Sequence, residues 1–309
     1  MTLATRTPPT AEEFLAYKQR FSNWGRWGEA DQLGTLNHIT PEVRRAAVGL
    51  ARHGRSVSCA NPIATRAVVP DLRRNDNPAD HRMRVGVAGS GDYIGVSYHG
   101  RLNTHIDALC HFFTGEGGQL YNGRSHTLVT DEGAKSNSVD HWRDGILTRG
   151  VLYDIPRMRG TDYVTFDRPV EGWDLEDFAS QHGIEPRAGD AVLVRAGSDP
   201  CWAANANLEF SFPPTQPGVA ASALEFLFDH GAALLAWDLM EAPAQNLPSR
   251  SPIHEVAIPY MGMPLLDNAN FERLAQVCAE LGRYEFLFVV APLVVIGGTG
   301  SPVNPIATF

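Results

Sequence analysis

The chain lacks the cysteine pattern of a disulfide-bonded protein. Four cysteines are spread over its 309 residues, at Cys59, Cys110, Cys201 and Cys278, and no two of them have the spacing of a pair. Residues 1–9 contain no apolar core of the kind found in signal peptides. We therefore expect reduced thiols and a cytoplasmic protein.

Long apolar runs and basic runs are also absent. The longest apolar stretch, 286–296, contains Pro292 and is too short to span a bilayer, so we expect a buried strand there. The 26 basic and 35 acidic residues give a net charge of −9, and the basic residues form no long run. Membranes and nucleic acids are therefore poor partners, and a small-molecule substrate is expected.

Two common functional motifs are missing as well. The sequence has no Gly-x-Ser-x-Gly nucleophile elbow, which argues against Ser-His-Asp catalysis. The glycine-rich segment 297–301 has no P-loop lysine, so phosphate binding is a weak interpretation. The chemistry must come from other residues.

The composition and the pattern of apolar residues predict one α/β domain over residues 1–309, with a central mixed sheet and an N-terminal helical arm at about 10–54. The sequence predicts helices at 14–21, 41–52, 175–181, 219–229 and 271–281. A Thr10–Glu13 capping box precedes the first of them, and Thr40 is the N-cap of the second. Strand signals cover 66–69, 95–98, 151–155, 191–195, 233–237 and 286–296. Segments 70–91 and 114–137 are predicted to be long loops, of the kind that often form lids.

The most informative segment is 98–111, which contains four metal-competent side chains: His99, His105, Asp107 and His111. Imidazole and carboxylate ligands together suit zinc, manganese or ferrous iron. A divalent ion can lower the pKa of a bound water to about 7 and supply hydroxide at neutral pH. This pattern indicates hydrolysis or a related addition to a carbonyl.

The spacing of these residues supports one common site. His105 and Asp107 are two residues apart and would point the same way from a strand. His111 lies four residues beyond Asp107, one helical turn if the chain coils after Ala108. The alternative is that the histidines make structural hydrogen bonds, but this clustering favours a metal or acid/base site. Thr104 is a candidate for orienting a ligand ring.

Residues 101–112, Arg-Leu-Asn-Thr-His-Ile-Asp-Ala-Leu-Cys-His-Phe, resemble the motif His-x-Gly-Thr-His-x-Asp-x-Pro-x-His-Phe of the cyclase family of metal-dependent hydrolases. This family includes bacterial kynurenine formamidases and isatin hydrolases. Arg101, Asn103 and Leu109 depart from the motif. Further similar segments, 23–37, 121–123, 149–154, 189–195 and 297–302, extend the resemblance over most of the chain. A longer branch of the family has a His-Gly pair six residues before the Thr-His histidine, and His99-Gly100 fits it.

The resemblance implies the swivelling β/β/α architecture and a divalent metal centre, with zinc or manganese as the ion. The implied ligands are His105, Asp107 and His99, the last replacing the ligand lost at Arg101, whose guanidinium cannot bind a metal. Segments containing His254 and Asp267 resemble those that supply late ligands, although the family usually has Glu at the second position. We expect one firmly bound ion and leave a second open.

The implied function is hydrolysis of a carbon–nitrogen bond in an N-formyl or cyclic amide, with an aromatic substrate and His111 as general acid/base. Arg101 is a candidate for binding a substrate carboxylate. Trp24 and Trp27, close to glycines, either line an aromatic pocket or pack structurally. By analogy with the family, a homodimer or homotetramer is expected.

Two alternatives to hydrolysis stay open. The same ion could serve a cyclase or dehydratase, a lyase acting on a carbonyl substrate. A non-catalytic member is also conceivable, because Arg101 and Asp267 weaken the ordinary ligand set. Outside the motif, Asp238 and Glu241 follow a strand end where α/β sheets place sites, although solvated or structural carboxylates are the favoured interpretation. Cys110 is expected to be a small buried hydrophobe rather than a nucleophile.

Overall fold

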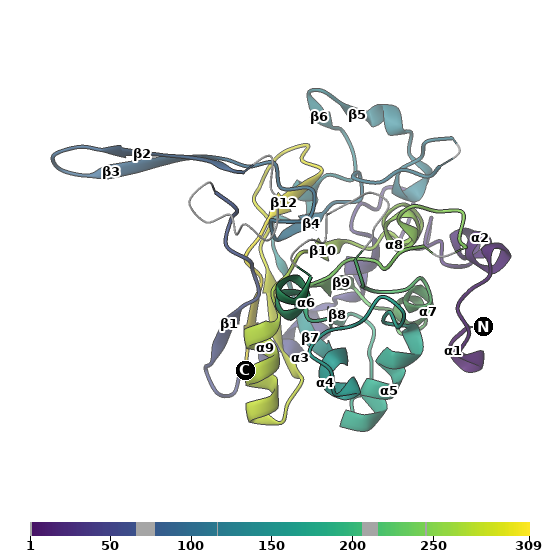
Figure 1. The fold of residues 1–309 in the computed structure, drawn as a ribbon. Helices are drawn as coiled ribbons and strands as arrows, with labels where there is room; N and C mark the ends of the chain where they lie inside the picture. The colour runs from purple at the N-terminus through teal and green to yellow at the C-terminus, as the bar shows by residue number, and fades with distance from the viewer. Residues whose placement is uncertain (1, 66–77, 116, 206–215, 245) are drawn as a thin grey trace.

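The computed structural model describes residues 2–65, 78–115, 117–205, 216–244 and 246–309 (Figure 1). Within these ranges the centre of the molecule is a nine-stranded sheet. In spatial order its strands are β1 (Ser56–Ser58), β13 (Ile306–Thr308), β11 (Glu285–Val290), β7 (Ile146–Asp154), β8 (Ala191–Arg195), β9 (Leu234–Trp237), β10 (Leu265–Asp267), β4 (His105–Asp107) and β12 (Gly300–Pro302). Strands β7 to β10 are parallel, and the remaining neighbours pair antiparallel. The predicted mixed sheet is confirmed.

Helices lie on both sides of this sheet, with α9 in front of it and α3 behind it in Figure 1. The helices are α1 (Thr2–Thr5), α2 (Ala11–Arg20), α3 (Pro41–Val48), α4 (Ile155–Arg159), α5 (Gly172–His182), α6 (Ser198–Ala204), α7 (Ala223–Asp229), α8 (Pro252–Val256) and α9 (Glu272–Leu281). All residues of β9 and all but the last of β8 are buried. Strands covered on both faces explain why these segments read as continuous apolar runs.

The predicted helix boundaries are mostly confirmed, and the differences have local causes. The Thr10–Glu13 capping box and the Thr40 N-cap are present. Helix α3 is shorter than predicted and ends at Val48, capped by Gly49. Helix α5 begins earlier than predicted, at Gly172, and the carboxylate of Asp174, its third residue, accepts from the backbone N–H of Glu171.

Segment 10–54 contains α2 and α3. Helix α2 packs on the body through Phe14, Tyr17 and Phe21, which are at most 2% exposed. The Tyr17 hydroxyl donates to the buried carboxylate of Glu225 in α7. Burial of these aromatic side chains attaches α2 firmly to the body.

Two strand predictions are wrong in part. Segment 95–98 is not a strand, because the extended chain ends at Gly95 as the second half of a hairpin, β2 (Asp80–Val85) and β3 (Ser90–Gly95). This hairpin projects from the body (Figure 1) and occupies much of the predicted loop 70–91. Strand β11 ends at Val290, just before Pro292, and residues 293–296 are exposed rather than buried. The strand predicted at 66–69 lies outside the described residues.

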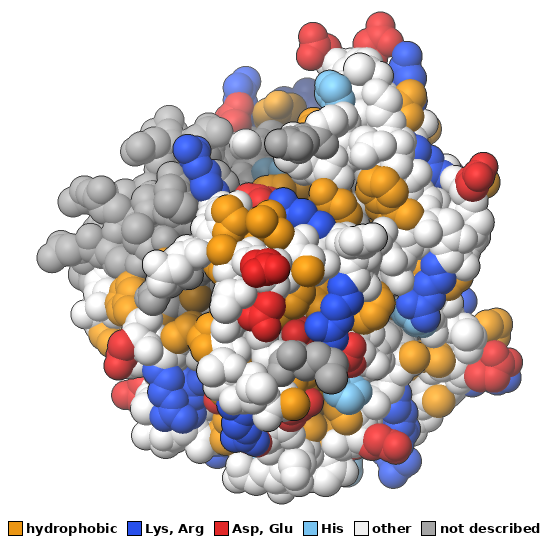
Figure 2. Space-filling model, turned by 90° about the vertical axis from the view of Figure 1, so that its right-hand side faces the viewer, with side chains coloured by type: hydrophobic (Ala, Val, Ile, Leu, Met, Phe, Trp, Pro, Cys, Tyr) orange, Lys and Arg blue, Asp and Glu red, His pale blue; other side chains and the backbone are white. Residues whose placement is uncertain are grey.

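The second predicted loop, 114–137, contains short elements. These are the turns at Tyr121–Gly123 and His126–Leu128 and a two-stranded hairpin, β5 (Val129–Thr130) and β6 (Gly133–Ala134). Among the described residues, every helix is too short or too polar to cross a bilayer. On the face drawn in Figure 2, basic side chains are scattered among acidic and uncharged groups rather than gathered into one band.

Candidate metal centre

Strand β4 contributes His105 and Asp107 to the candidate site. It lies between β10 and β12, and its register places His105 directly opposite Asp267. Because Asp107 is two residues further along, its side chain points to the same face as that of His105. The Nε2 atom of His105 lies 3.4 Å from Asp107 Oδ1 and 3.9 Å from Asp267 Oδ2. All three side chains are buried.

Two further histidines approach Asp107 from the segments that flank β4. The Nδ1 atom of His99 lies 3.0 Å from Asp107 Oδ1, and the Nε2 atom of His111 lies 3.7 Å from Asp107 Oδ2. The two imidazoles stack with 3.8 Å between their centroids. His111 returns to the cluster through a turn, in which its N–H donates to the carbonyl of Ala108, rather than through a helix.

The late histidine joins the same cluster. His254, in α8, places Nε2 3.2 Å from Asp267 Oδ2 and 3.6 Å from Asp107 Oδ2. Its Nδ1 atom lies 2.9 Å from the buried carboxylate of Glu241. The other oxygen of Asp267 accepts from the indole N–H of Trp237 at 2.6 Å. His254 and Asp267 therefore have hydrogen-bond partners on both sides.

Asp107 and His99 differ from His254 and Asp267 in their hydrogen bonding. Three buried atoms of Asp107 and His99 have no hydrogen-bond partner among the described residues. These atoms are both carboxylate oxygens of Asp107 and Nδ1 of His99. Their mutual contact of 3.0 Å is short enough for a hydrogen bond, but it lacks suitable angles. Buried polar atoms without partners are rare and call for an explanation.

A bound divalent ion would provide that explanation. Two sets of three residues could hold an ion, and both include Asp107. Within each set, the ligand atoms lie within 4.8 Å of one another. The sets are His99, Asp107 and His111, and His105, Asp107 and Asp267. Ligands bound at about 2.1 Å to a tetrahedral zinc ion are about 3.4 Å apart. The contacts around Asp107, 3.0–3.7 Å, match that separation. The nitrogen and oxygen donors present fit zinc or manganese.

The electrostatics of the cluster favour an ionised aspartate. Burial alone would raise the pKa of Asp107, but His111, His105 and His254 hold that pKa well below its usual value. Burial would lower the pKa of His254, but Glu241 and Asp267 raise it well above normal. Burial lowers the pKa of His111 to about 4. The cluster therefore combines a permanent anion with a neutral imidazole at its edge.

Neighbouring groups select the ring nitrogens that face the cluster. The Nδ1 atom of His105 lies 2.8 Å from the carbonyl oxygen of Asn103, and Nε2 of His99 lies 2.9 Å from Oγ1 of Thr299. When these outer nitrogens carry the protons, the inner ones present lone pairs to a cation. Thr104 does not orient a ligand ring, because its hydroxyl donates to the carbonyl of Asn268 instead.

The guanidinium of Arg101 donates to the amide oxygen of Gln216, at the edge of a small cavity also lined by Asn61 and Asn268. Burial lowers the pKa of Arg101, while the negative charges of Glu241 and Asp267 act in the opposite direction. Arg101 is therefore within electrostatic reach of the cluster.

The two tryptophans are not brought into the cluster. The Trp24 indole donates to the carbonyl of Pro259 at 2.7 Å and stacks on Tyr260, with centroids 5.8 Å apart. Trp27 meets the edge of His38 at 5.2 Å. The contacts of Trp24 tie the N-terminal segment to the segment after α8, and the contact of Trp27 stays within the N-terminal segment; both are packing roles.

Sequence reasoning undervalued Glu241 and did not identify Trp237 or Thr299. Glu241 is 1% exposed, so the solvated interpretation is wrong for it, and its position after the carboxyl end of β9 was the available signal. Asp238 is structural, because its carboxylate accepts from the backbone N–H groups at the start of α6. Burial raises the pKa of the Cys110 thiol to about 12, which argues against a nucleophilic role.

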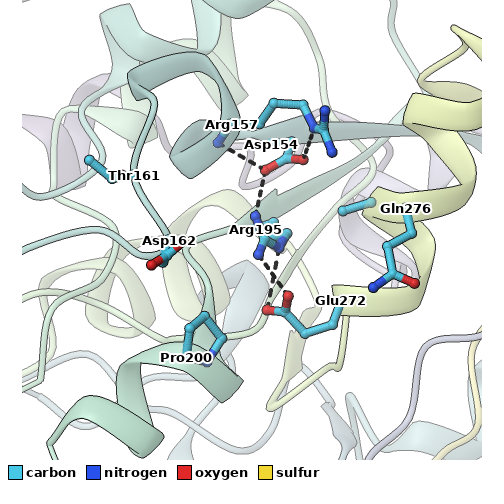
Figure 3. Close-up of a pocket in the computed structure, with 9 residues that line it drawn as sticks. Asp154, Arg157, Thr161, Asp162, Arg195, Pro200, Glu272 and Gln276 are labelled. Atoms are coloured by element: carbon cyan, nitrogen blue, oxygen red, sulfur yellow. Dashed lines mark hydrogen bonds and ion pairs between the residues drawn. The ribbon is translucent and has the colours of Figure 1, made fainter.

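A second polar cavity, of about 520 Å³, lies at the carboxyl ends of β7 and β8 (Figure 3). Arg195 bridges the fully buried Asp154 and Glu272, the first residue of α9, with contacts of 2.7 and 2.6 Å. Arg157 also donates to Asp154. These charges pair with one another, so the network joins β7 and β8 to α4 and α9. It contains none of the candidate metal ligands.

Comparison with known proteins agrees with this fold. The Cyclase family model matches residues 32–243. A crystal structure described as a novel cyclase is 27% identical, with a TM-score of 0.81 over 94% of this chain and 99% of that chain. An isatin hydrolase bound to the product analogue thioisatinate is 18% identical, with a TM-score of 0.57 over 87% of this chain and 98% of that one.

Isatin hydrolase A from Labrenzia aggregata, bound to benzyl benzoate, is 20% identical with a TM-score of 0.57, over 86% of this chain and 98% of that chain. Both isatin hydrolases share the fold. No curated protein sequence matches this chain. The family match covers more than half of the residues, and the expected α/β architecture is confirmed. The chain therefore belongs to the cyclase family.

Proposed function

We propose that the protein is a metal-dependent hydrolase that cleaves a carbon–nitrogen bond in an aromatic N-formyl or cyclic amide. The observation that carries the proposal is the buried carboxylate of Asp107, surrounded by imidazoles but without a hydrogen-bond donor. A divalent ion bound there would polarise a substrate carbonyl and lower the pKa of water.

The ion, zinc or manganese, would be held by His99, His105 and Asp107. This assignment places His99 where the family motif has its first histidine, although the sequence position is shifted by two residues. His254 and Asp267 could hold a second ion, but they already have protein partners on both sides. One firmly bound ion is therefore the simpler proposal.

His111 would serve as general acid/base. Its side chain is 25% exposed, whereas that of His105 is 1% exposed, so of these two His111 is the one a substrate can reach. Its imidazole would accept a proton from the attacking water and deliver it to the leaving nitrogen. Stacking on His99 holds the ring in place during both transfers.

Arg101 would supply the charge that recognises an acidic group of the substrate. It lines the small cavity near Gln216, within electrostatic reach of Glu241 and Asp267, and its fork of N–H donors matches a carboxylate. In this role, the arginine that replaces the motif histidine at position 101 would bind the substrate. A ligand supplied by His99 would remove the main reason for considering a non-catalytic protein.

The test is a substrate panel containing N-formylkynurenine, isatin and simple lactones, assayed with the metal-loaded enzyme and with His105→Ala as control. Release of formate or ring-opened product by the wild type alone supports the proposal. Turnover of none of these, with water loss or ring closure on a carbonyl substrate, would contradict it in favour of a lyase.

A further inference from the structure

Asn268 has an unusual backbone conformation at the edge of the candidate metal site. It follows Asp267 directly, is buried, and has a φ of 53°, in the left-handed region that few residues other than glycine adopt. Asparagine tolerates this region better than most residues, because its short polar side chain can form local hydrogen bonds. Conformations of this kind gather at functional sites, where the surrounding contacts maintain them. The contacts of Asn268 therefore bear on the site.

The turn at Asn268 moves the chain from one neighbouring segment to another. Up to Asp267, strand β10 pairs with β4, and the two strands lie side by side in Figure 1. Beyond the turn, Ala269 pairs with Ala60 instead. At this junction the carbonyl of Asn268 accepts from the hydroxyl of Thr104 at 2.6 Å. The backbone of residue 268 is thus held by contacts that do not involve its own side chain.

The side-chain amide of Asn268 makes a separate pair of contacts, with the segment that joins the candidate ligands His99 and His105. Its Nδ2 atom donates to the carbonyl of Gly100 at 2.6 Å and to the carbonyl of Asn103 at 3.2 Å. An amide nitrogen carries two N–H groups, so both donors are used. Gly100 comes directly after His99 in the sequence. Asn103 comes two residues before His105.

The Asn103 carbonyl connects this amide to the ring of His105. Its oxygen lies 2.8 Å from Nδ1 of His105. A carbonyl oxygen has two lone pairs, so it can accept from the amide and from the imidazole together. When Nδ1 donates to this oxygen, Nε2 of His105, which lies 3.4 Å from Asp107 Oδ1, presents its lone pair to a cation. A shift of the Asn103 carbonyl would therefore change the direction of that lone pair.

The Gly100 carbonyl connects the same amide to His99. Gly100 has a φ of 126°, and a Cβ atom added to it would meet no atom within 4 Å. Steric contacts therefore leave the backbone at Gly100 free to rotate, and glycine is the most permissive residue in this respect. The hydrogen bond from Asn268 restricts that rotation directly beside His99.

We propose that Asn268 is a positioning residue, which sets the direction of two metal ligands, His99 and His105, through one side-chain amide. The inference rests on the proposed metal centre and gives Asn268 no contact with the ion. The two carbonyls lie at opposite ends of segment 100–103, so the amide fixes both ends of the connection between the two ligands.

A zinc titration of a glycine variant tests the proposal. Asn268→Gly removes the amide, but glycine adopts the left-handed conformation without strain, so the backbone contacts of residue 268 are kept. The Kd for zinc, measured in competition with a chelator, should rise about 10- to 100-fold, the range for loss of groups that orient ligand histidines. The stoichiometry at saturating zinc should stay that of the wild type.

The matched control is Asn137→Gly. Asn137 also has a positive φ, 61°, and is fully buried, but its amide donates to the carbonyl of Tyr121 and accepts from Arg124, neither of which is a candidate ligand. Both variants lose buried hydrogen bonds and should unfold more easily without metal. Only Asn268→Gly should bind zinc more weakly. Wild-type affinity in Asn268→Gly, or an equal loss in both variants, overturns the proposal.

Cobalt(II) provides a geometric readout, because its visible spectrum depends on the arrangement of its ligands. At saturating cobalt, the spectrum of Asn268→Gly should differ from that of the wild type, and the spectrum of Asn137→Gly should match it. Identical spectra for all three proteins overturn the positioning role and leave the metal centre standing. A wild type that binds neither zinc nor cobalt overturns both. Zinc binding that depends on Asn268, in a protein without hydrolase activity, supports this inference and refutes only the proposed reaction.

Discussion

The side chain of Thr299 should control the affinity for the metal ion without touching it. Its hydroxyl oxygen lies 2.9 Å from Nε2 of His99, on the side of the ring opposite Asp107. For Nδ1 to offer its lone pair to an ion, the proton must be on Nε2, and the hydroxyl oxygen of Thr299 accepts the hydrogen bond from that N–H. Thr299→Val keeps the volume of the side chain but removes the acceptor.

The expected effect follows from the role of such outer partners. Loss of a group that orients a ligand histidine typically weakens metal binding by 10- to 100-fold, or about 1.4–2.7 kcal/mol. Thr299→Ser retains the hydroxyl and should stay close to wild type. The backbone carbonyl of Thr299 accepts from Ala108, and this bond is unaffected by either substitution.

The measurement is a competition titration of zinc against a chelator of known affinity, performed on the metal-free wild type and both variants. Thermal unfolding of the metal-free proteins serves as a control and should be similar for all three. If Thr299→Val binds zinc as tightly as the wild type, or if Thr299→Ser loses as much affinity as Thr299→Val, the proposed ligand role of His99 is refuted.

Three other predictions concern stability, binding and metal content. Arg195→Ala leaves the buried Asp154 with Arg157 as its remaining arginine partner and removes the ion pair with Glu272, so it should lower the free energy of unfolding by about 3 kcal/mol in urea, with the metal content unchanged. Arg101→Ala should raise KM for substrates that carry a carboxylate and leave the ion stoichiometry intact; loss of the ion would contradict its assignment to the substrate. Zinc at 100 times its Kd should raise the free energy of unfolding by about 2.7 kcal/mol. His105→Ala should abolish this gain, and an equal gain in that variant would place the ion elsewhere.

The part of the site that could be predicted from the sequence is local. His105 and Asp107 share a face because the side chains of a strand alternate, and this holds whatever surrounds the strand. His111 returns to the cluster as its spacing from Asp107 indicated, although a turn rather than a helix brings it back. Strands β8 and β9 were found from their apolar runs because they are buried on both faces.

The remaining parts depend on contacts between distant segments. Glu241 and His254 are thirteen residues apart in the sequence, and His99 and Thr299 are two hundred apart, so no spacing rule predicts that they are in contact. The sequence does not predict the β2–β3 hairpin, because its alternation of apolar and polar residues is interrupted by glycines and its exposed strands face no core. Apolar residues 293–296 were assigned to a buried strand, but Pro292 ends the ladder after Val290.

Metal analysis of the protein purified without added metal tests the central claim most directly, with Asp107→Asn as the matched variant because it keeps the shape of the side chain and removes its charge. We expect about one zinc or manganese ion per chain in the wild type, and loss of that ion in the variant. An unchanged ion content in Asp107→Asn, or full activity of the wild type after exhaustive chelation, would contradict the account.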